Sequence, residues 1–263
     1  MMKYEILSDK TYEVLRCFNY GCYIKNKISN KYYFMNIEDF AKVKERPFPN
    51  VQKVKWNYID TIYFLLIALS IVSFIYLFFV KYDSIYDNTY VASEYVYMYG
   101  FMYSIMNIML HELSHYIAMK VYKRTPGKVR FKRYHVFLTI VTDTTDSYML
   151  PRYRRFVVYY SGVMINLLVY SLTILVFPRY AYLLRIVIWG ILYNMLPFGG
   201  LESDGYHILV NVILKINETR ECRKIIPLLL KIFFICFVVL SYINSIMNLL
   251  DKPSISDFLY SVF

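Results

Sequence analysis

An HExxH pattern, His111-Glu112-Leu113-Ser114-His115, lies in an apolar stretch of this chain that is long enough to cross a lipid bilayer. Two histidines four residues apart project from one face of an α-helix, so they can bind one metal ion, with the glutamate beside them as a base toward bound water. An ionisable side chain in the middle of a membrane helix costs roughly 2.5–3.5 kcal/mol, so three of them need a compensating interaction. A zinc ion would supply that interaction. The alternative is a polar cluster that faces the interior of a helix bundle.

The composition predicts an integral membrane protein. Hydrophobic residues make up 58% of the 263 residues, and the mean hydropathy is +0.36. Apolar runs of a length that can span a membrane predict about five transmembrane helices. These runs cover about 61–80, 98–119, 156–177, 181–198 and 225–249. The expected fold class is therefore an all-α polytopic membrane protein, with a β-hairpin at the membrane surface and a small α+β module at the N-terminus.

The charge distribution predicts the orientation. Segments rich and poor in Lys and Arg alternate between the apolar runs. By the positive-inside rule, the N-terminus lies in the cytosol, the protein crosses the cell membrane several times, and the HExxH site lies near the cytosolic face. The net charge of +11 then reflects contact with anionic lipid and not with nucleic acid. No signal peptide is expected, because the chain begins with polar and charged residues. The four cysteines lack the spacing of a metal site and are expected to be free thiols.

Residues 1–56 are predicted to form a small cytosolic module, and 57–263 the transmembrane domain that carries the HExxH pattern. Alternating apolar and polar residues on both sides of Ser29-Asn30 predict a β-hairpin, and 35–45 is expected to form a short helix. The module could bind a peptide, or it could serve as a packing or regulatory appendage.

A second β-rich segment follows the HExxH stretch. Val129, Phe131 and the run 136–141 favour strands lying at the cytosolic surface of the membrane. Such strands could pair with an extended substrate by strand addition, or they could form a closed hairpin that only covers the helices.

A third metal ligand is expected from elsewhere in the chain, because a catalytic zinc ion normally takes three protein ligands and leaves one position for water. The fourth apolar run ends near Pro197, where helix-breaking residues allow later carboxylates to fold back toward the helices. Asp204 is the first choice for this ligand, and Glu202 is the second. His207, one turn after Asp204, could bind the metal or support a ligand.

Other polar residues leave two interpretations open. Asn107 lies one turn before His111 and could orient that histidine, or its amide could bond a neighbouring helix. Asp143 and Asp146 could contact substrate or support the metal ligands. They could also be loop carboxylates near the arginines at 152–155.

Three motifs together resemble the site-2 protease family of intramembrane zinc metallopeptidases. They are HELSH, Gly162-x-x-x-Asn166, and Asn194-x-x-Pro197 ahead of Asp204-Gly205. The stretches VTDTTDSYMLPRYRRFVVYYSGVMINLL and DGYHIL resemble more specifically the bacterial peptide zinc metalloprotease branch of that family. The likeness covers about residues 98–215.

The resemblance implies a function and a set of site residues. His111, His115 and Asp204 would bind one zinc ion per chain, Glu112 would be the catalytic base, and the Asn194 amide would hold substrate or oxyanion. The reaction would be hydrolysis of a peptide bond in a membrane-associated or precursor peptide, as in the maturation of a modified peptide. Six residues separate Pro197 from Asp204, two more than usual in that family, so spacing alone would favour Glu202 as the ligand.

Two other function classes remain open from the sequence. A membrane protein that binds or transports metal would carry polar residues along the full depth of several spans, whereas here they gather at one end. A non-catalytic immunity or scaffold protein could keep the same fold. The sequence does not specify an oligomeric state.

Overall fold

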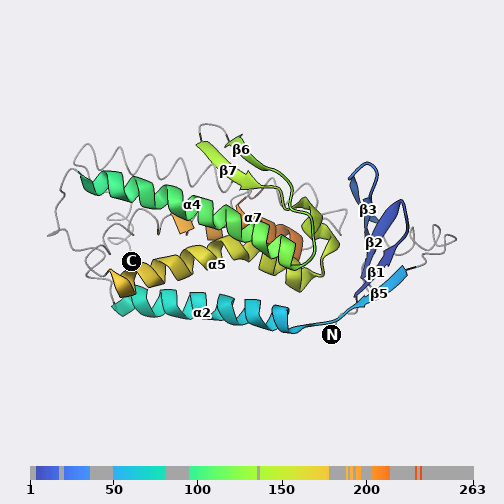
Figure 1. Cartoon of the computed structure of the whole chain (residues 1–263), viewed down its shortest axis with the longest axis horizontal. Coiled ribbons are helices and arrows are strands. Elements are labelled where there is room, and N and C mark those ends of the chain that lie inside the picture. The colour runs from blue at the N-terminus through green and yellow to red at the C-terminus, as the bar shows by residue number, and fades with distance from the viewer. Residues whose placement is uncertain are drawn as a thin grey trace.

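Three long helices lie side by side in the computed structural model of the chain (Figure 1). They are α2 (Tyr58–Val80), α4 (Tyr95–Val121) and α5 (Arg152–Val176). The short helix α7 (Asp204–His207) and the π-helical segment η3 (Ile208–Ile213) pack against α5. The residues that the structure describes are 4–17, 21–35, 50–80, 95–134, 137–177, 188, 190–191, 194–196, 203–213, 229 and 232.

Helix α5 lies between α2 and α4 and packs against both (Figure 1). In the most apolar stretch of α5, 72% is therefore buried, whereas only 17% of the corresponding stretch of α2 is buried. The main hydrophobic core lies along α5, where it contacts the two outer helices. This core includes Ile67, Leu77, Ala118, Met119, Val157, Val158, Val163, Leu167, Tyr170 and Ile174.

A five-stranded antiparallel sheet is formed near the N-terminus, in the order β4-β3-β2-β1-β5. Its strands are β1 (Tyr4–Ser8), β2 (Tyr12–Cys17), β3 (Gly21–Asn26), β4 (Tyr32–Met35) and β5 (Asn50–Val54). The predicted hairpin around Ser29-Asn30 is confirmed, since β3 and β4 pair there and Asn30 adopts a φ of 51°. Residues 36–45 of the predicted helix lie outside the described residues.

The predicted strands after the HExxH helix also form a hairpin, made of β6 (Val129–Tyr134) and β7 (Phe137–Thr142). Strand β7 packs against α4. The chain continues into the 3₁₀ helix η1 (Thr145–Met149), which packs against one face of the N-terminal sheet through Met149 and Tyr148. The position of the hairpin at a membrane surface stays a prediction, as does the division of the chain at residue 56.

The predicted all-α polytopic class is wrong. The described residues contain a five-stranded and a two-stranded sheet, and two of their helices, over Tyr58–Leu77 and Arg152–Val176, are long and apolar enough to cross a membrane. The predicted span at 98–119 forms α4, which is not one of these two helices. The predicted spans at 181–198 and 225–249 lie largely outside the described residues.

This correction has two physical reasons. The predicted span at 98–119 counted aromatic residues as apolar, but the tyrosines of α4 and its polar residues Asn107, His111, Glu112 and His115 lower its hydropathy. A count of apolar residues also does not show how strands pair. In the first 54 residues, alternating side chains pair into a sheet whose apolar face packs against η1.

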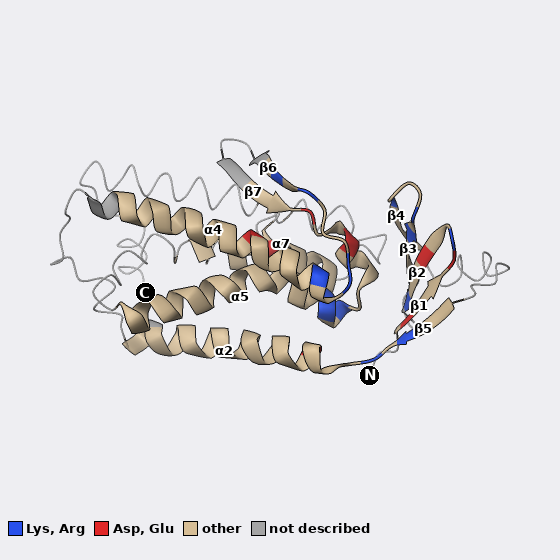
Figure 2. Ribbon diagram, in the orientation of Figure 1, with Lys and Arg blue, Asp and Glu red and all other residues tan. Residues whose placement is uncertain are grey.

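Polar contacts join the two candidate spans at the end nearest the sheet, where Figure 2 shows basic residues at the ends of α4 and α5. Asn57 and Asp60 cap α2 reciprocally, because each side chain accepts a hydrogen bond from the other residue's backbone N–H. Asp60 is fully buried and accepts two hydrogen bonds of 2.8 Å from the guanidinium of Arg154 on α5. This ion pair sets the relative position of α2 and α5.

We expect Asp60→Asn to lower the free energy of unfolding by about 3–5 kcal/mol, because removing one charge leaves the Arg154 guanidinium without its buried counter-ion. The measurement is the midpoint of thermal unfolding of the full chain in detergent. Lys53→Gln, at an exposed position on β5, is the matched control and should leave the midpoint unchanged. Equal midpoints for the two variants would contradict a stabilising role of the pair.

Candidate metal centre

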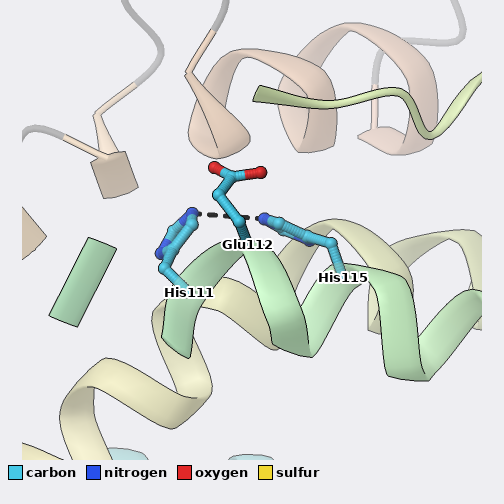
Figure 3. Close-up of side chains that lie close together, drawn as sticks. All are labelled: His111, Glu112 and His115. Atoms are coloured by element: carbon cyan, nitrogen blue, oxygen red, sulfur yellow. Dashed lines mark hydrogen bonds between the residues drawn. The ribbon is translucent and has the colours of Figure 1, made fainter. Parts of the chain in front are cut away.

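The two histidines of the HExxH pattern lie on the face of α4 that is turned toward α5. His111 and His115 are 6% and 4% exposed, and their Nε2 atoms are 3.2 Å apart. Figure 3 shows the two imidazoles facing each other, with Glu112 rising between them from the same helix. One ligand atom from each of these three residues lies within 4.8 Å of the others.

Gly162 on α5 makes the space for the two rings. A Cβ atom at this position would lie 2.4 Å from Nε2 of His111 and 2.6 Å from Nε2 of His115. Any side chain here would therefore displace the imidazoles. The absence of a side chain lets α5 lie directly against the point where the two Nε2 atoms meet.

The Nδ1 atoms of both rings contact polar groups of α5. Nδ1 of His115 lies 2.8 Å from the carbonyl oxygen of Val158 and 3.2 Å from Oγ of Ser161. Nδ1 of His111 lies 3.2 Å from the side-chain amide of Asn166, whose oxygen has no hydrogen bond within the described part of the chain. A ring that binds a cation through Nε2 carries its proton on Nδ1, and this proton needs an acceptor. The Val158 carbonyl is such an acceptor, and the Asn166 oxygen becomes one when the amide is turned over.

Asp204 brings a carboxylate to the same point from a distant part of the chain. Ser203 caps α7 by accepting a hydrogen bond from the N–H of Tyr206, and it donates one of 2.6 Å to the carbonyl of Leu196. The carboxylate oxygens of Asp204 then lie 2.9 Å from Nε2 of His111 and 3.4 Å from Nε2 of His115. Burial alone would raise the pKa of the Asp204 carboxyl, but the two adjacent imidazoles hold it below its ordinary value.

These three residues fit a zinc ion. Ligand atoms about 2.0–2.1 Å from a tetrahedral zinc lie about 3.3 Å from one another. Here the two Nε2 atoms are 3.2 Å apart, Oδ2 of Asp204 lies 2.9 Å from that of His111, and Oδ1 lies 3.4 Å from that of His115. Oδ2 of Asp204 is buried, and the polar group nearest to it among the described residues is Nε2 of His111, 2.9 Å away. A cation between these two atoms would bind both of them. Two imidazoles and one carboxylate form a common ligand set of catalytic zinc.

Glu112 is bound to a different part of the protein. Its Oε2 accepts a hydrogen bond of 2.6 Å from the backbone N–H of Thr142 on β7, and its carbonyl accepts one of 3.2 Å from the Thr142 hydroxyl. This contact holds the carboxylate of Glu112 beside the histidine pair.

A polar cavity of about 80 Å³ opens onto these groups, which is ample room for water. Besides the residues above, Asn194 and His207 line it. The His207 ring stacks on Tyr159 with centroids 5.3 Å apart, and its Nδ1 lies 3.3 Å from the Asn211 amide.

A larger apolar groove of about 680 Å³ runs along α4 and the β6–β7 hairpin. Glu112 and Ile140 line both the groove and the polar cavity. The other groove residues are Met102, Ile105, Met106, Met109, Leu110, Leu113, Tyr116 and Val129. Among the described residues that line the groove, Glu112 is therefore the only carboxylate, and Tyr116 is the only other residue with an ionisable side chain.

The structure brings together five of the predicted site residues, namely His111, Glu112, His115, Asn194 and Asp204. Glu202, the second choice for the metal ligand, lies outside the described residues. Among the other candidates, Asn107 donates a hydrogen bond to the Tyr103 carbonyl of its own helix. Asp143 bonds the nearby Thr145, and Asp146 pairs with Lys25 and not with the arginines at 152–155.

Sequence reasoning missed several of the groups that orient the site. Thr142 and Val158 act through backbone atoms, so residue type carries no signal for them. Ser161 was also missed, although small residues in an apolar helix indicate a close contact with another helix. Gly162 and Asn166 were identified as a family-like motif, but the motif did not show that they contact the histidines.

The chain is similar to a protein of Bacillus subtilis (strain 168) named "Putative peptide zinc metalloprotease protein YydH". The two are 26% identical over 219 residues, which cover 80% of this chain and 82% of that protein. No family model matches the chain, and no solved structure matches it. The relative's name agrees with a zinc site at the histidine pair.

We expect Gly162→Ala to lower zinc affinity by about 10–100-fold or more, because the added methyl group displaces both imidazoles from their common point. The measurement is competition for zinc between the purified chain and a chromophoric chelator. Gly190→Ala is the matched control, since nothing lies within 4 Å of a Cβ at that position. Wild-type affinity in Gly162→Ala would contradict this site.

Proposed function

We propose that this chain is a zinc-dependent endopeptidase that hydrolyses a peptide bond of a membrane-associated or precursor peptide. One zinc ion would be held by His111, His115 and Asp204. The observation that carries the proposal is the meeting of these three ligands, at separations of 2.9–3.4 Å, directly beside the carboxylate of Glu112. The name of the similar Bacillus subtilis protein supports the same reaction.

Zinc at this point would lower the pKa of water and polarise the carbonyl of the peptide bond. The residues of the chain perform the proton transfers. Glu112 takes a proton from the attacking water as the water oxygen bonds to the carbonyl carbon. When the C–N bond breaks, the same carboxyl passes that proton to the leaving amine. Because Thr142 bonds Oε2, the other oxygen of Glu112 is the one that carries the proton.

Asn194 has the right chemistry to bind the substrate carbonyl. It lines the cavity together with the proposed ligands, and a side-chain amide can donate a hydrogen bond to an oxygen that gains negative charge during the reaction. We assign it this role.

The apolar groove supports a substrate with large apolar side chains near the cleaved bond. It opens at Glu112, so a peptide lying in it reaches the catalytic base. Methionines supply three of its lining residues, and their flexible side chains adapt to different apolar groups. The peptide would be extended at the cleavage point, since a helix hides its carbonyls in hydrogen bonds.

A membrane location agrees with α2 and α5, which are long and apolar enough to cross a bilayer. We propose that the protein lies in the cell membrane, with its N-terminus and its site toward the cytosol. The charge pattern supports this orientation, because basic residues gather at the ends of α4 and α5 nearest the sheet (Figure 2).

Glu112→Gln should bind zinc as the wild type does and lower cleavage by at least about 10²–10⁴-fold, because the amide keeps an oxygen for Thr142 but cannot take a proton. His111→Ala should lose both zinc and activity. The assay is mass spectrometry of a library of unstructured apolar peptides incubated with the full chain in detergent. Glu5→Gln, on the N-terminal sheet, is the control and should cleave normally.

Zinc-dependent cleavage at an unchanged rate by Glu112→Gln, or no cleavage of any peptide by the wild type, would contradict the proposal. A zinc transporter, in contrast, would move zinc into proteoliposomes whether residue 112 is Glu or Gln.

Met109→Trp should fill part of the groove and lower cleavage of peptides with Leu or Phe near the cleaved bond, with little effect on peptides that carry Ala there. The measurement is the ratio of kcat/KM for the two peptide sets. Leu65→Trp, at an equally apolar and exposed position on α2, should leave that ratio unchanged. The same change of this ratio in both variants would contradict a role of the groove in substrate binding.

A further inference from the structure

Asp146 on η1 is a buried carboxylate that the proposed reaction does not use. Only 5% of the residue is exposed, yet it makes three polar contacts. Oδ1 accepts hydrogen bonds of 2.7 Å from Lys25 Nζ and 2.8 Å from the Tyr32 hydroxyl, and Oδ2 accepts one of 3.0 Å from the N–H of Thr125. Burial would raise the pKa of this carboxyl, but the three hydrogen bonds outweigh it and hold the pKa below its ordinary value.

These contacts join three segments of the chain. Lys25 lies on β3 and Tyr32 on β4 of the N-terminal sheet, Thr125 follows α4, and Asp146 itself follows β7. The side chains of Lys25 and Asp146 are only 14% and 6% exposed, so water cannot readily replace either one. Hydrogen bonds to charged, buried groups are the strong ones in proteins, and they fix geometry as well as energy.

The residue that binds the carboxylate of Glu112 lies only four positions before Asp146. It is Thr142, which donates its backbone N–H to Oε2 of Glu112. Between them, the carbonyl of Asp143 accepts a hydrogen bond of 2.8 Å from the N–H of Gly127. A Cβ at Gly127 would lie 2.5 Å from the Asp143 side chain, so the two segments are in close contact. The stretch 142–146 is therefore bound to α4 at one end and to the N-terminal sheet at the other.

We propose that Asp146 is a positioning residue for Glu112, and that the N-terminal sheet acts on catalysis through Lys25 and Tyr32. The sheet orients the segment whose first N–H holds the carboxylate of the base. The catalytic meaning of this contact rests on the proposed function, whereas the coupling itself can be measured without any substrate.

The test compares Asp146→Asn and Tyr32→Phe with the wild type, using the full chain in detergent. Hydrogen–deuterium exchange of peptides covering 137–145 reports on the N–H of Thr142. We expect exchange there to rise by about tenfold or more in Asp146→Asn and by less in Tyr32→Phe, in proportion to the hydrogen bonds removed. Zinc content should stay at the wild-type level. In the peptide assay, kcat should fall by about tenfold while KM stays within about twofold.

The matched control is Glu13→Gln. Glu13 also joins the sheet to the rest of the protein, through an ion pair of 2.7 Å with Arg124, but it does not contact Asp146. If Asp146 acts specifically, this variant leaves both exchange at 137–145 and kcat unchanged.

Wild-type exchange in both Asp146→Asn and Tyr32→Phe would overturn the proposal, and so would an equal rise in Glu13→Gln, which would indicate docking of the sheet alone. If Asp146→Asn exchanges faster but the wild-type protein cleaves no peptide, the coupling between Asp146 and Glu112 is upheld and the proposed peptidase function is contradicted.

Discussion

The burial of two imidazoles and a carboxylate at one point between apolar helices is the constraint on which the rest of the structure depends. An isolated charge in such surroundings costs far more than a domain's whole stability, unless it is paired or coordinates a metal. Several neighbouring residues position these three side chains. Gly162 leaves room for the rings, α5 supplies acceptors for Nδ1 protons, and Ser203 caps the turn that presents Asp204.

The site combines a rigid part with parts brought from other segments. The imidazoles stand on α4 and are oriented by α5, so two packed helices determine their positions. Asp204 and the contact to Glu112 come instead from the start of α7 and the end of β7. The two histidines, held by packed helices, keep their geometry. The positions of Asp204 and of the Glu112 carboxylate depend instead on segments that respond to what packs against them.

How far the sequence predicts this site depends on whether the signal is local. His111, Glu112 and His115 follow from one helical pattern, and Asp204 from helix-breaking residues together with the family-like motif. The roles of Thr142 and Val158 could not be predicted from the sequence, because both residues contact the site side chains through backbone atoms. The first hairpin was predicted from alternation and the second from residues that favour strands, but the predicted fold class was wrong. Hydropathy identified apolar runs without showing that the first strands pair into a five-stranded sheet.

The geometry of a single helix explains why Glu112 depends on β7. Successive residues of an α-helix are turned by about 100°, so a side chain next to His111 cannot face α5 as His111 does. Glu112 points instead toward the β6–β7 hairpin, where the N–H of Thr142 meets its carboxylate. The same direction places Glu112 on the boundary between the polar cavity and the apolar groove. If the proposed reaction holds, a peptide that enters along the groove passes Glu112 before it reaches the histidines. The hairpin would then both orient the base and form one wall of the substrate path.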